Sequence, residues 1–127
     1  MSRIRSKGMK PEMIVRQLVH GMGYRYRLHR NDLPGKPDLV FGPCRKVIFI
    51  HGCFWHQHPD PDCKIARLPK SRLDYWIPKL ERNFERDCEH QNQLEREGWK
   101  VLTVWECEIR SKEGNSLPGR LRAFLEG

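Results

Sequence analysis

The stretch from Val47 to Cys63, VIFIHGCFWHQHPDPDC, constrains the fold more than any other part of the chain. It opens with four β-branched or aromatic residues in a row, without polar alternation. Such a run is typical of a central strand that is buried on both faces of a sheet. Three histidines, two cysteines and a Phe-Trp pair follow at once. We therefore expect a buried strand that carries a chemically active, metal-binding loop.

Apolar periodicity predicts a mixed α/β domain around this strand. Pro11 suits the first turn of a helix, and apolar residues at helical spacing follow it until Gly21 and Gly23. A short amphipathic helix is expected over about residues 117–125. Together these elements predict a small sheet flanked by helices. Runs of β-branched and aromatic residues predict its strands, over residues 24–28, 38–41, 47–50 and 100–105.

A long helix is predicted between about residues 71 and 97. Ser71 and Asp74 resemble a capping box at its start, and Gly98 marks its end. Pro78 predicts a kink or a restart within it. Residues at helical spacing predict its buried face, namely Leu80, Phe84, Cys88, Gln91 and Leu94.

Composition narrows the class of protein. A chain of 127 residues predicts a single domain, 1–127, with a basic arm over residues 1–9. The 24 Lys and Arg against 16 Asp and Glu give a net charge of +8, which favours a polyanionic partner such as nucleic acid. Without a signal-peptide pattern or a membrane-length apolar run, a cytoplasmic protein is expected. That reducing compartment disfavours disulfides, so Cys53, Cys63 and Cys107 are expected to bind metal or to be simply buried, and Cys44 and Cys88 to be structural or surface thiols.

The spacing Cys53-x4-His58-x4-Cys63 predicts a zinc site. Thiolates with an imidazole suit Zn²⁺ in a closed tetrahedral site, which needs a fourth ligand. Cys107 follows the predicted strand 100–105, and pairing with a neighbouring strand would bring it to the loop. The alternative is that these cysteines are simply buried.

A second set of residues points to phosphodiester chemistry. Asp38 begins one predicted strand and Ile50 ends another, and a carboxylate beside a backbone carbonyl offers hard ligands for Mg²⁺. His51 and His56 are candidates to bind a phosphate or to act as general base, with Asp87 as the partner that orients a histidine ring. The alternative for Asp38 is a structural role in a turn.

Aromatic residues lie among these polar groups. Phe54 and Trp55 stand inside the polar loop, and Trp76 follows in the stretch DYW. In a basic protein such rings can stack on bases or wedge between them. The alternative is that they cap the hydrophobic core.

Five segments match one protein family, in order along the chain. They are RSKGMKPE (5–12), LPGKPDLVF (33–41), VIFIHGCFWHQH (47–58), DYWIPKLERNFERD (74–87) and GWKVLTVWEC (98–107). With these motifs the chain resembles the very-short-patch repair endonucleases, which nick DNA beside T:G mismatches. The motif HGCFWH, between a buried strand and a zinc loop, is highly specific.

The resemblance implies a restriction-endonuclease-like core of the PD-(D/E)xK type and a Mg²⁺-dependent cut of one DNA strand in a bacterial-type, nucleoid-associated setting. It implies that Asp38 binds the metal with the Ile50 carbonyl and that His56 is the general base. The other implied active-site residues are a second histidine, a glutamate on the first helix and the carboxylate that supports the base, namely His51, Glu12 and Asp87. The implied zinc ligands are Cys53, His58, Cys63 and Cys107, and the implied intercalating aromatics are Phe54, Trp55 and Trp76.

The chain departs from the family pattern at three places. Ile50 replaces a threonine, the residues PDPD lengthen the gap before Cys63, and only four residues precede RSK. Two rival functions stay open: a related nuclease that cuts without a mismatch, and a zinc-stabilised DNA-binding module without catalysis. Double-stranded DNA is the expected partner, mismatch-repair proteins are further candidates, and a monomer is the expected oligomeric state.

Overall fold

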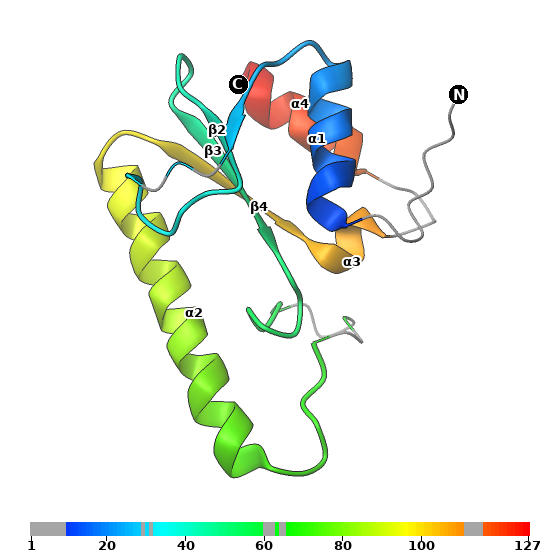
Figure 1. The fold of residues 1–127 in the computed structure, drawn as a ribbon, viewed down its shortest axis with the longest axis vertical. Coiled ribbons are helices and arrows are strands. Elements are labelled where there is room, and N and C mark those ends of the chain that lie inside the picture. The colour runs from blue at the N-terminus through cyan, green and yellow to red at the C-terminus, as the bar shows by residue number, and fades with distance from the viewer. Residues whose placement is uncertain (1–9, 29, 31, 60–62, 64–65, 111–115) are drawn as a thin grey trace.

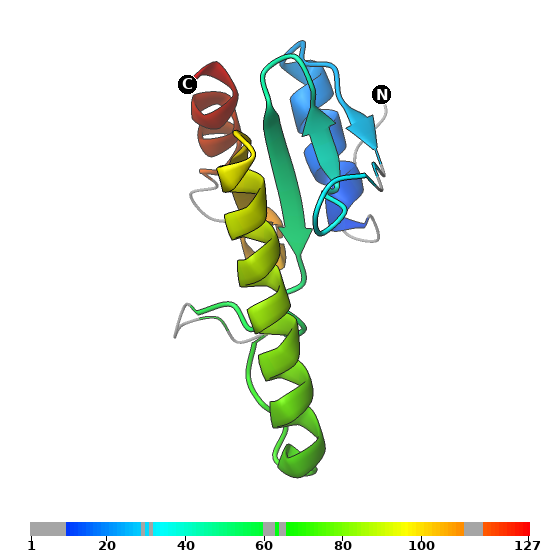
Figure 2. The same cartoon turned by 90° about the vertical axis from the view of Figure 1, so that its left-hand side faces the viewer.

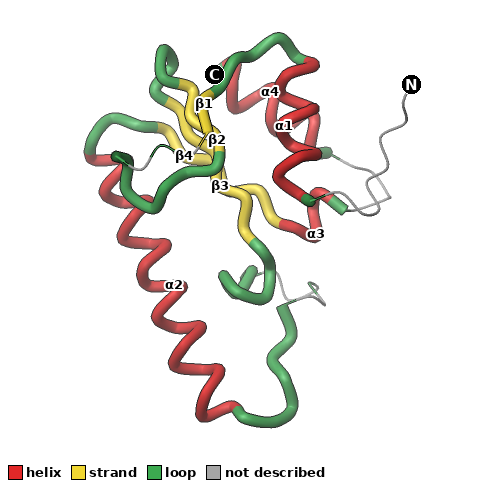
Figure 3. Tube along the Cα trace, in the orientation of Figure 1, coloured by secondary structure: helices red, strands yellow, loops and turns green. Residues whose placement is uncertain are grey.

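A four-stranded mixed sheet lies at the centre of the fold (Figure 3). The computed structural model describes residues 10–127 apart from 29, 31, 60–62, 64–65 and 111–115, so the predicted basic arm over 1–9 lies outside the described residues. The first three strands are antiparallel neighbours, and the fourth runs parallel to the third. In sheet order the strands are β1 (Arg27–Leu28), β2 (Leu39–Phe41), β3 (Lys46–His51) and β4 (Lys100–Trp105).

Helices cover both faces of this sheet (Figure 1). On one face lie α1 (Pro11–Gly21), α3 (Glu106–Ile109) and α4 (Leu117–Glu126). On the other lies α2 (Leu73–Arg96), which Figure 2 shows in front of the strands. The predicted mixed α/β architecture is confirmed, and the short helix α3 is an addition to it. None of the helices in the described part of the chain is long and apolar enough to span a membrane.

Both faces of β3 are buried, as its apolar run predicts. Ile48 belongs to the cluster that packs against α1 and α4, whereas Val47 and Phe49 belong to the cluster beneath α2. Alternate residues of a strand point to opposite faces, so an unbroken apolar run serves two cores at once.

The first strand is shorter than the predicted strand over 24–28. Only Arg27 and Leu28 pair with β2, because β2 ends at Phe41 and the chain turns away after it. The rings of Tyr24 and Tyr26 instead pack edge-on against Phe41, with centroids 6.5 and 6.2 Å away.

The start of α2 differs from the predicted capping box. The helix begins at Leu73, and its N-cap is Arg72, whose φ of 59° is left-handed and whose side chain makes no capping bond. Ser71 therefore lies outside the helix, and the capping-box prediction is wrong. Pro78 does not restart the helix, which is a single element of 24 residues (Figure 2).

The buried face of α2 is only partly the predicted one. Leu80 and Leu94 are buried and Gln91 is half-buried, but Phe84 and Cys88 are exposed. The buried and half-buried positions 80, 83, 87, 90 and 94 recur every three or four residues, so they set the inward face of the helix and leave Phe84 and Cys88 beside it. In Figure 1 only the C-terminal part of α2 lies over the sheet. Between the two buried leucines, the half-buried positions of the helix are polar: Asn83, Asp87, His90 and Gln91.

The contrast between Leu94 and Phe84 predicts unequal contributions to stability. Leu94→Ala should lower the free energy of unfolding by about 2–5 kcal/mol, because it leaves a cavity in a fully buried site. Phe84→Ala removes a larger side chain from the same helix, yet should cost under about 1 kcal/mol because Phe84 is 48% exposed. Urea unfolding measures both values, and equal losses would contradict the observed packing.

Candidate active site and metal centre

The antiparallel pairing of β2 with β3 holds Asp38 against the end of β3. The Asp38 backbone N–H donates to the Ile48 carbonyl at 3.1 Å. The Ile50 backbone N–H donates to Asp38 Oδ2 at 2.7 Å. The carboxylate is thus fixed across the strand pair, beside the residue whose carbonyl is the predicted second Mg²⁺ ligand.

A polar cavity of about 200 Å³ opens at this point. It collects four of the five predicted catalytic residues, Asp38, His51, His56 and Asp87, together with Ile50. Glu12 does not line it: this residue lies in the first turn of α1, on the other side of the sheet. Its catalytic role stays a prediction. The remaining lining residues are Gly35, Lys36, Phe49, His90 and Gln91.

His56 and Asp87 form the closest polar contact in the cavity. His56 Nδ1 lies 2.5 Å from Asp87 Oδ2, and both side chains are largely buried. A carboxylate at Nδ1 keeps the ring proton on that nitrogen, so Nε2 remains the proton acceptor. The pair therefore has the chemistry of an oriented general base.

His51 stacks on the ring of His56, with centroids 3.8 Å apart and planes 7° from parallel. Burial, together with the neighbouring His56, lowers the pKa of His51 to about 4, while the Asp87 carboxylate acts in the opposite direction. At neutral pH His51 is therefore an uncharged ring, which disfavours it as a cation for a phosphate. Its Nδ1 is buried without a hydrogen-bond partner among the described residues, and such orphaned groups are typical of functional sites.

The polar middle of α2 forms one wall of the site. Asn83, Asp87 and Gln91 recur every four residues, so they share one face of the helix. The Asn83 amide donates to the Trp55 carbonyl at 3.3 Å, and the Gln91 amide donates to Thr103 Oγ1 at 2.7 Å. The helix thus connects both the loop after β3 and strand β4 to the His56–Asp87 pair.

The predicted metal ligands form a second cluster. One donor atom from each of Cys53, His58, Cys63 and Cys107 can be chosen so that all lie within 4.8 Å of one another. Both Cys53 and Cys63 are buried, while Cys44 and Cys88 are exposed. Three sulfurs and one imidazole nitrogen are a donor set that suits a soft or borderline divalent cation.

Parallel pairing of β3 and β4 assembles this cluster. The register sets His51 opposite Trp105, so Cys53 and Cys107 each lie two residues beyond a strand end. The Cys107 backbone N–H donates to Cys53 Sγ at 3.3 Å, and His58 Nδ1 lies 3.4 Å from Cys107 Sγ. The His58 ring also stacks on Trp105, at 4.3 Å between centroids.

Burial raises the pKa of Cys53 to about 12. At neutral pH this thiol stays protonated unless a cation stabilises its thiolate. A bound cation would stabilise the thiolate and so deprotonate this thiol.

The loop between the two sites carries the predicted DNA-contacting aromatics. Backbone bonds from His56 to Gly52 and from His58 to Cys53 wind it into turns. Phe54 and Trp55 meet Trp76 of α2 in a three-ring cluster, with centroids 5.3–5.7 Å apart. Trp55 is 47% exposed, so the cluster is open to solvent and does not cap the core.

Sequence reasoning missed three polar groups around the active site, Lys36, His90 and Asn83. Lys36 lies in the loop NDLPGK, which reads as an ordinary turn, but its φ of 50° is uncommon for a side chain other than glycine. His90 packs on Gly35, where a Cβ would lie 2.9 Å from the His90 Cβ. Helical spacing from Asp87 would have indicated His90 and Asn83, three or four residues away.

Comparisons with known proteins identify the family of the chain. Residues 1–64 match the family model described as "DNA mismatch endonuclease Vsr". The chain is 52% identical to the "Type II nicking enzyme V.XorIIP" of Xanthomonas oryzae pv. oryzae, over 99% of this chain and 89% of that protein.

Two further relatives widen the comparison. The chain is 44% identical to the "Type II nicking enzyme V.NmeAIP" of Neisseria meningitidis, over 88% of this chain and 78% of the relative. It is 39% identical to the "DNA mismatch endonuclease Vsr" of Escherichia coli K12, over 100% of this chain and 81% of the relative. With this family match and these identities, the chain belongs to the Vsr family and is a DNA endonuclease.

Proposed function

We propose that the chain is a Mg²⁺-dependent endonuclease that nicks one strand of duplex DNA beside a T:G mismatch. The observation that carries the proposal is the His56–Asp87 pair, which shares one cavity with Asp38. An oriented base beside a cross-strand carboxylate is what hydrolysis of a phosphodiester requires. The mismatch substrate follows the E. coli relative, whose name states it.

In this proposal His56 activates the attacking water. Asp87 holds the proton at Nδ1, so Nε2 can take a proton from water as it attacks phosphorus. Asp87 then stabilises the imidazolium that forms, because a partly buried carboxylate interacts strongly with a neighbouring charge. His51, uncharged and stacked on His56, keeps the plane of that ring fixed.

Asp38 and the Ile50 carbonyl would hold the magnesium ion. Both are hard oxygen donors, and Mg²⁺ commonly takes one or two carboxylates and completes its shell with water and substrate phosphate. When bound, the ion would supply charge stabilisation at the scissile phosphate and leaving oxygen. The Ile50 N–H bond to Asp38 orients the carboxylate for this role.

Phe54, Trp55 and Trp76 would contact the bases. Phe54 and the exposed Trp55 lie on the loop that also carries His56, and Trp76 of α2 completes the ring cluster, so base contact and water activation are coupled through a short segment. Separating two base pairs costs a few kcal/mol and costs least at a mismatch. That difference is a physical source of mismatch preference.

Zinc is the ion proposed for the cluster of Cys53, His58, Cys63 and Cys107. Its role would be structural, because the four protein donors complete a tetrahedral shell and leave no position for substrate. The ion would fix the loop between its ligands, which carries the general base His56 and the rings of Phe54 and Trp55.

The names of the nicking-enzyme relatives favour a second candidate within the same chemistry. V.XorIIP and V.NmeAIP are described as type II nicking enzymes, without mention of a mismatch. A nickase that cuts fully paired DNA would use the same His56, Asp87 and Asp38.

Removing the proposed general base, His56, or the proposed metal-binding carboxylate, Asp38, tests this chemistry. His56→Ala and Asp38→Ala should each lower single-turnover nicking of a T:G duplex by at least about a hundred-fold, since a general base contributes 10²–10⁴-fold. Binding of the duplex should survive in both variants. Glu126→Gln, at an exposed carboxylate on α4, is the control. Retained nicking in His56→Ala would exclude His56 as the base.

Substrate comparison separates the two candidates. Two duplexes of one sequence, one with a T:G mismatch and one fully paired, should be nicked at rates that differ by at least about ten-fold, in favour of the mismatch. Equal rates would instead assign the chain to the mismatch-independent candidate. The same assay with EDTA should show no cleavage of either duplex.

The zinc proposal is tested by metal analysis of the purified protein. About one zinc per chain is expected in the wild type and in Cys88→Ser, since Cys88 lies outside the cluster. Cys63→Ser should lose the zinc and melt at a lower temperature, because metal binding energy contributes directly to folding. Wild-type protein without zinc, or Cys63→Ser with undiminished zinc, would refute the assignment.

A further inference from the structure

We propose that the region around β1 is a second DNA-binding surface, which grips the duplex backbone outside the active site. Its basic side chains, those of His20, Arg25, Arg27 and Arg30, form what we call the β1 track. The proposal rests on the chain being a DNA endonuclease, and it does not depend on the mismatch preference proposed above.

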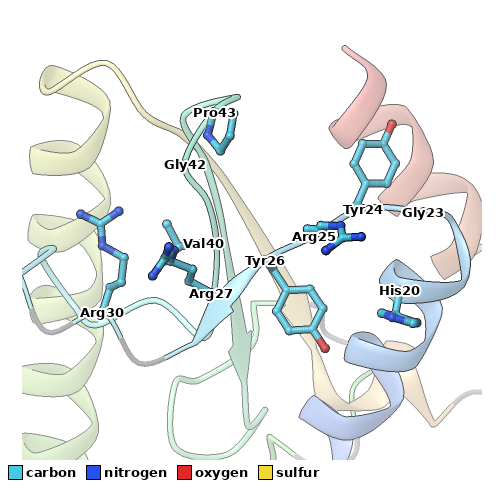
Figure 4. A pocket seen from close by; sticks show the side chains of 10 residues that line it. All are labelled: His20, Gly23, Tyr24, Arg25, Tyr26, Arg27, Arg30, Val40, Gly42 and Pro43. Carbon is cyan, nitrogen blue, oxygen red and sulfur yellow. The ribbon is translucent and has the colours of Figure 1, made fainter.

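A broad hollow of about 810 Å³ lies along the β1 track. Figure 4 shows its side chains running from α1, where His20 projects, across the strand toward α2, near Arg30. Within the described part of the chain, no carboxylate lines this hollow. The lining residues besides the track are Gly23, Tyr24, Tyr26, Val40, Gly42 and Pro43.

Inward tyrosines alternate with outward arginines along residues 24–27. Tyr24 and Tyr26 pack inward on Phe41, so Arg25 and Arg27, between and beyond them, are exposed. The two exposed arginines form no ion pair within the described residues. Their charges are therefore available to a ligand.

Arg30 is held differently from the other two arginines. Its guanidinium makes a two-point contact with Asp32, at 3.0 and 2.6 Å, and it approaches the Trp99 ring at 6.0 Å. Arg30 thus has a fixed orientation at the α2 end of the track, while its charge is largely balanced. The net positive charge of the surface comes from Arg25 and Arg27.

The track lies close enough to the active site for one duplex to reach both. Arg27 pairs with Val40, which is two residues from Asp38 along the chain. Ideal strand spacings place the Cα atoms of Arg27 and Asp38 roughly 8 Å apart. Duplex DNA carries one negative charge per roughly 1.7 Å of axis, so phosphates that flank the cut would fall within reach of the track.

A plainer explanation is that these charges protect the sheet edge. Charged side chains on an edge strand prevent pairing with another chain, and β1 is an edge strand. This explanation predicts aggregation, and no change in DNA affinity, when the charges are removed. The two explanations therefore differ in a measurable way.

The test measures how duplex affinity depends on salt. The double variant Arg25→Gln/Arg27→Gln is compared with the wild type, using a fully paired 20-base-pair duplex in EDTA so that no cleavage occurs. Loss of two phosphate contacts should reduce the slope of log affinity against log salt by about 1.8, since each contact contributes about 0.9. Affinity at low salt should fall at least about ten-fold.

The control is Arg110→Gln/Arg122→Gln, which removes the same charge elsewhere. Both arginines pair with glutamates four residues away, on α3 and α4. This variant should keep the wild-type slope. An unchanged slope in the Arg25/Arg27 variant, or an equal fall in the control, would overturn the proposal.

A nicking assay distinguishes failure of the β1-track proposal from failure of the proposed function. At saturating enzyme the Arg25/Arg27 variant should nick at the wild-type rate, because the track lies outside the cavity with His56. A wild type that binds the duplex with the expected salt slope but shows no preference for a T:G mismatch would refute only the mismatch proposal. The β1 track would stand in that case.

Discussion

The parallel pairing of β3 with β4 is the constraint on which the rest of the structure depends. Its register sets His51 opposite Trp105, so the segments that follow the two strands emerge side by side at the same end of the sheet. The metal cluster joins these two segments through Cys53 and Cys107. Because β3 also pairs with β2, Asp38 lies at the same end of the sheet. One strand thus positions both the polar cavity with His56 and the cluster of potential metal ligands.

The crossover between the two parallel strands is itself part of the site. A parallel pair needs a long connection, and here that connection contains α2. Leu94 anchors α2 on the sheet. The polar middle of the helix then contacts the loop, His56 and β4 through Asn83, Asp87 and Gln91, respectively. Asp87 and Gln91 line the cavity and Asn83 bonds the loop beside it, which explains why these helix positions are polar.

Much of this arrangement could be predicted from the sequence, because strong local patterns carry it. The apolar run of β3 and the spacing of Cys53, His58 and Cys63 predicted a central strand and a cluster of potential metal ligands, and the structure brings these three residues together with Cys107. Features that depend on long-range placement were harder. Phe84 is exposed because the inward face of α2 follows the polar positions 83, 87 and 90, and the helix starts at Leu73 after a left-handed Arg72, which no local pattern indicates. Lys36 and His90 belong to the cavity only because two distant segments meet there.

The wide separation of the metal ligands in the sequence has a consequence for biogenesis. Cys53, His58 and Cys63 leave the ribosome together, but Cys107 follows more than forty residues later, after the whole of α2. In the proposed zinc site, an ion that arrived during translation would therefore meet an incomplete shell, and the fourth ligand would join only when β4 docks beside β3. Completion of that site would then coincide with the pairing of the two parallel strands that brings the loop after β3 to its final place.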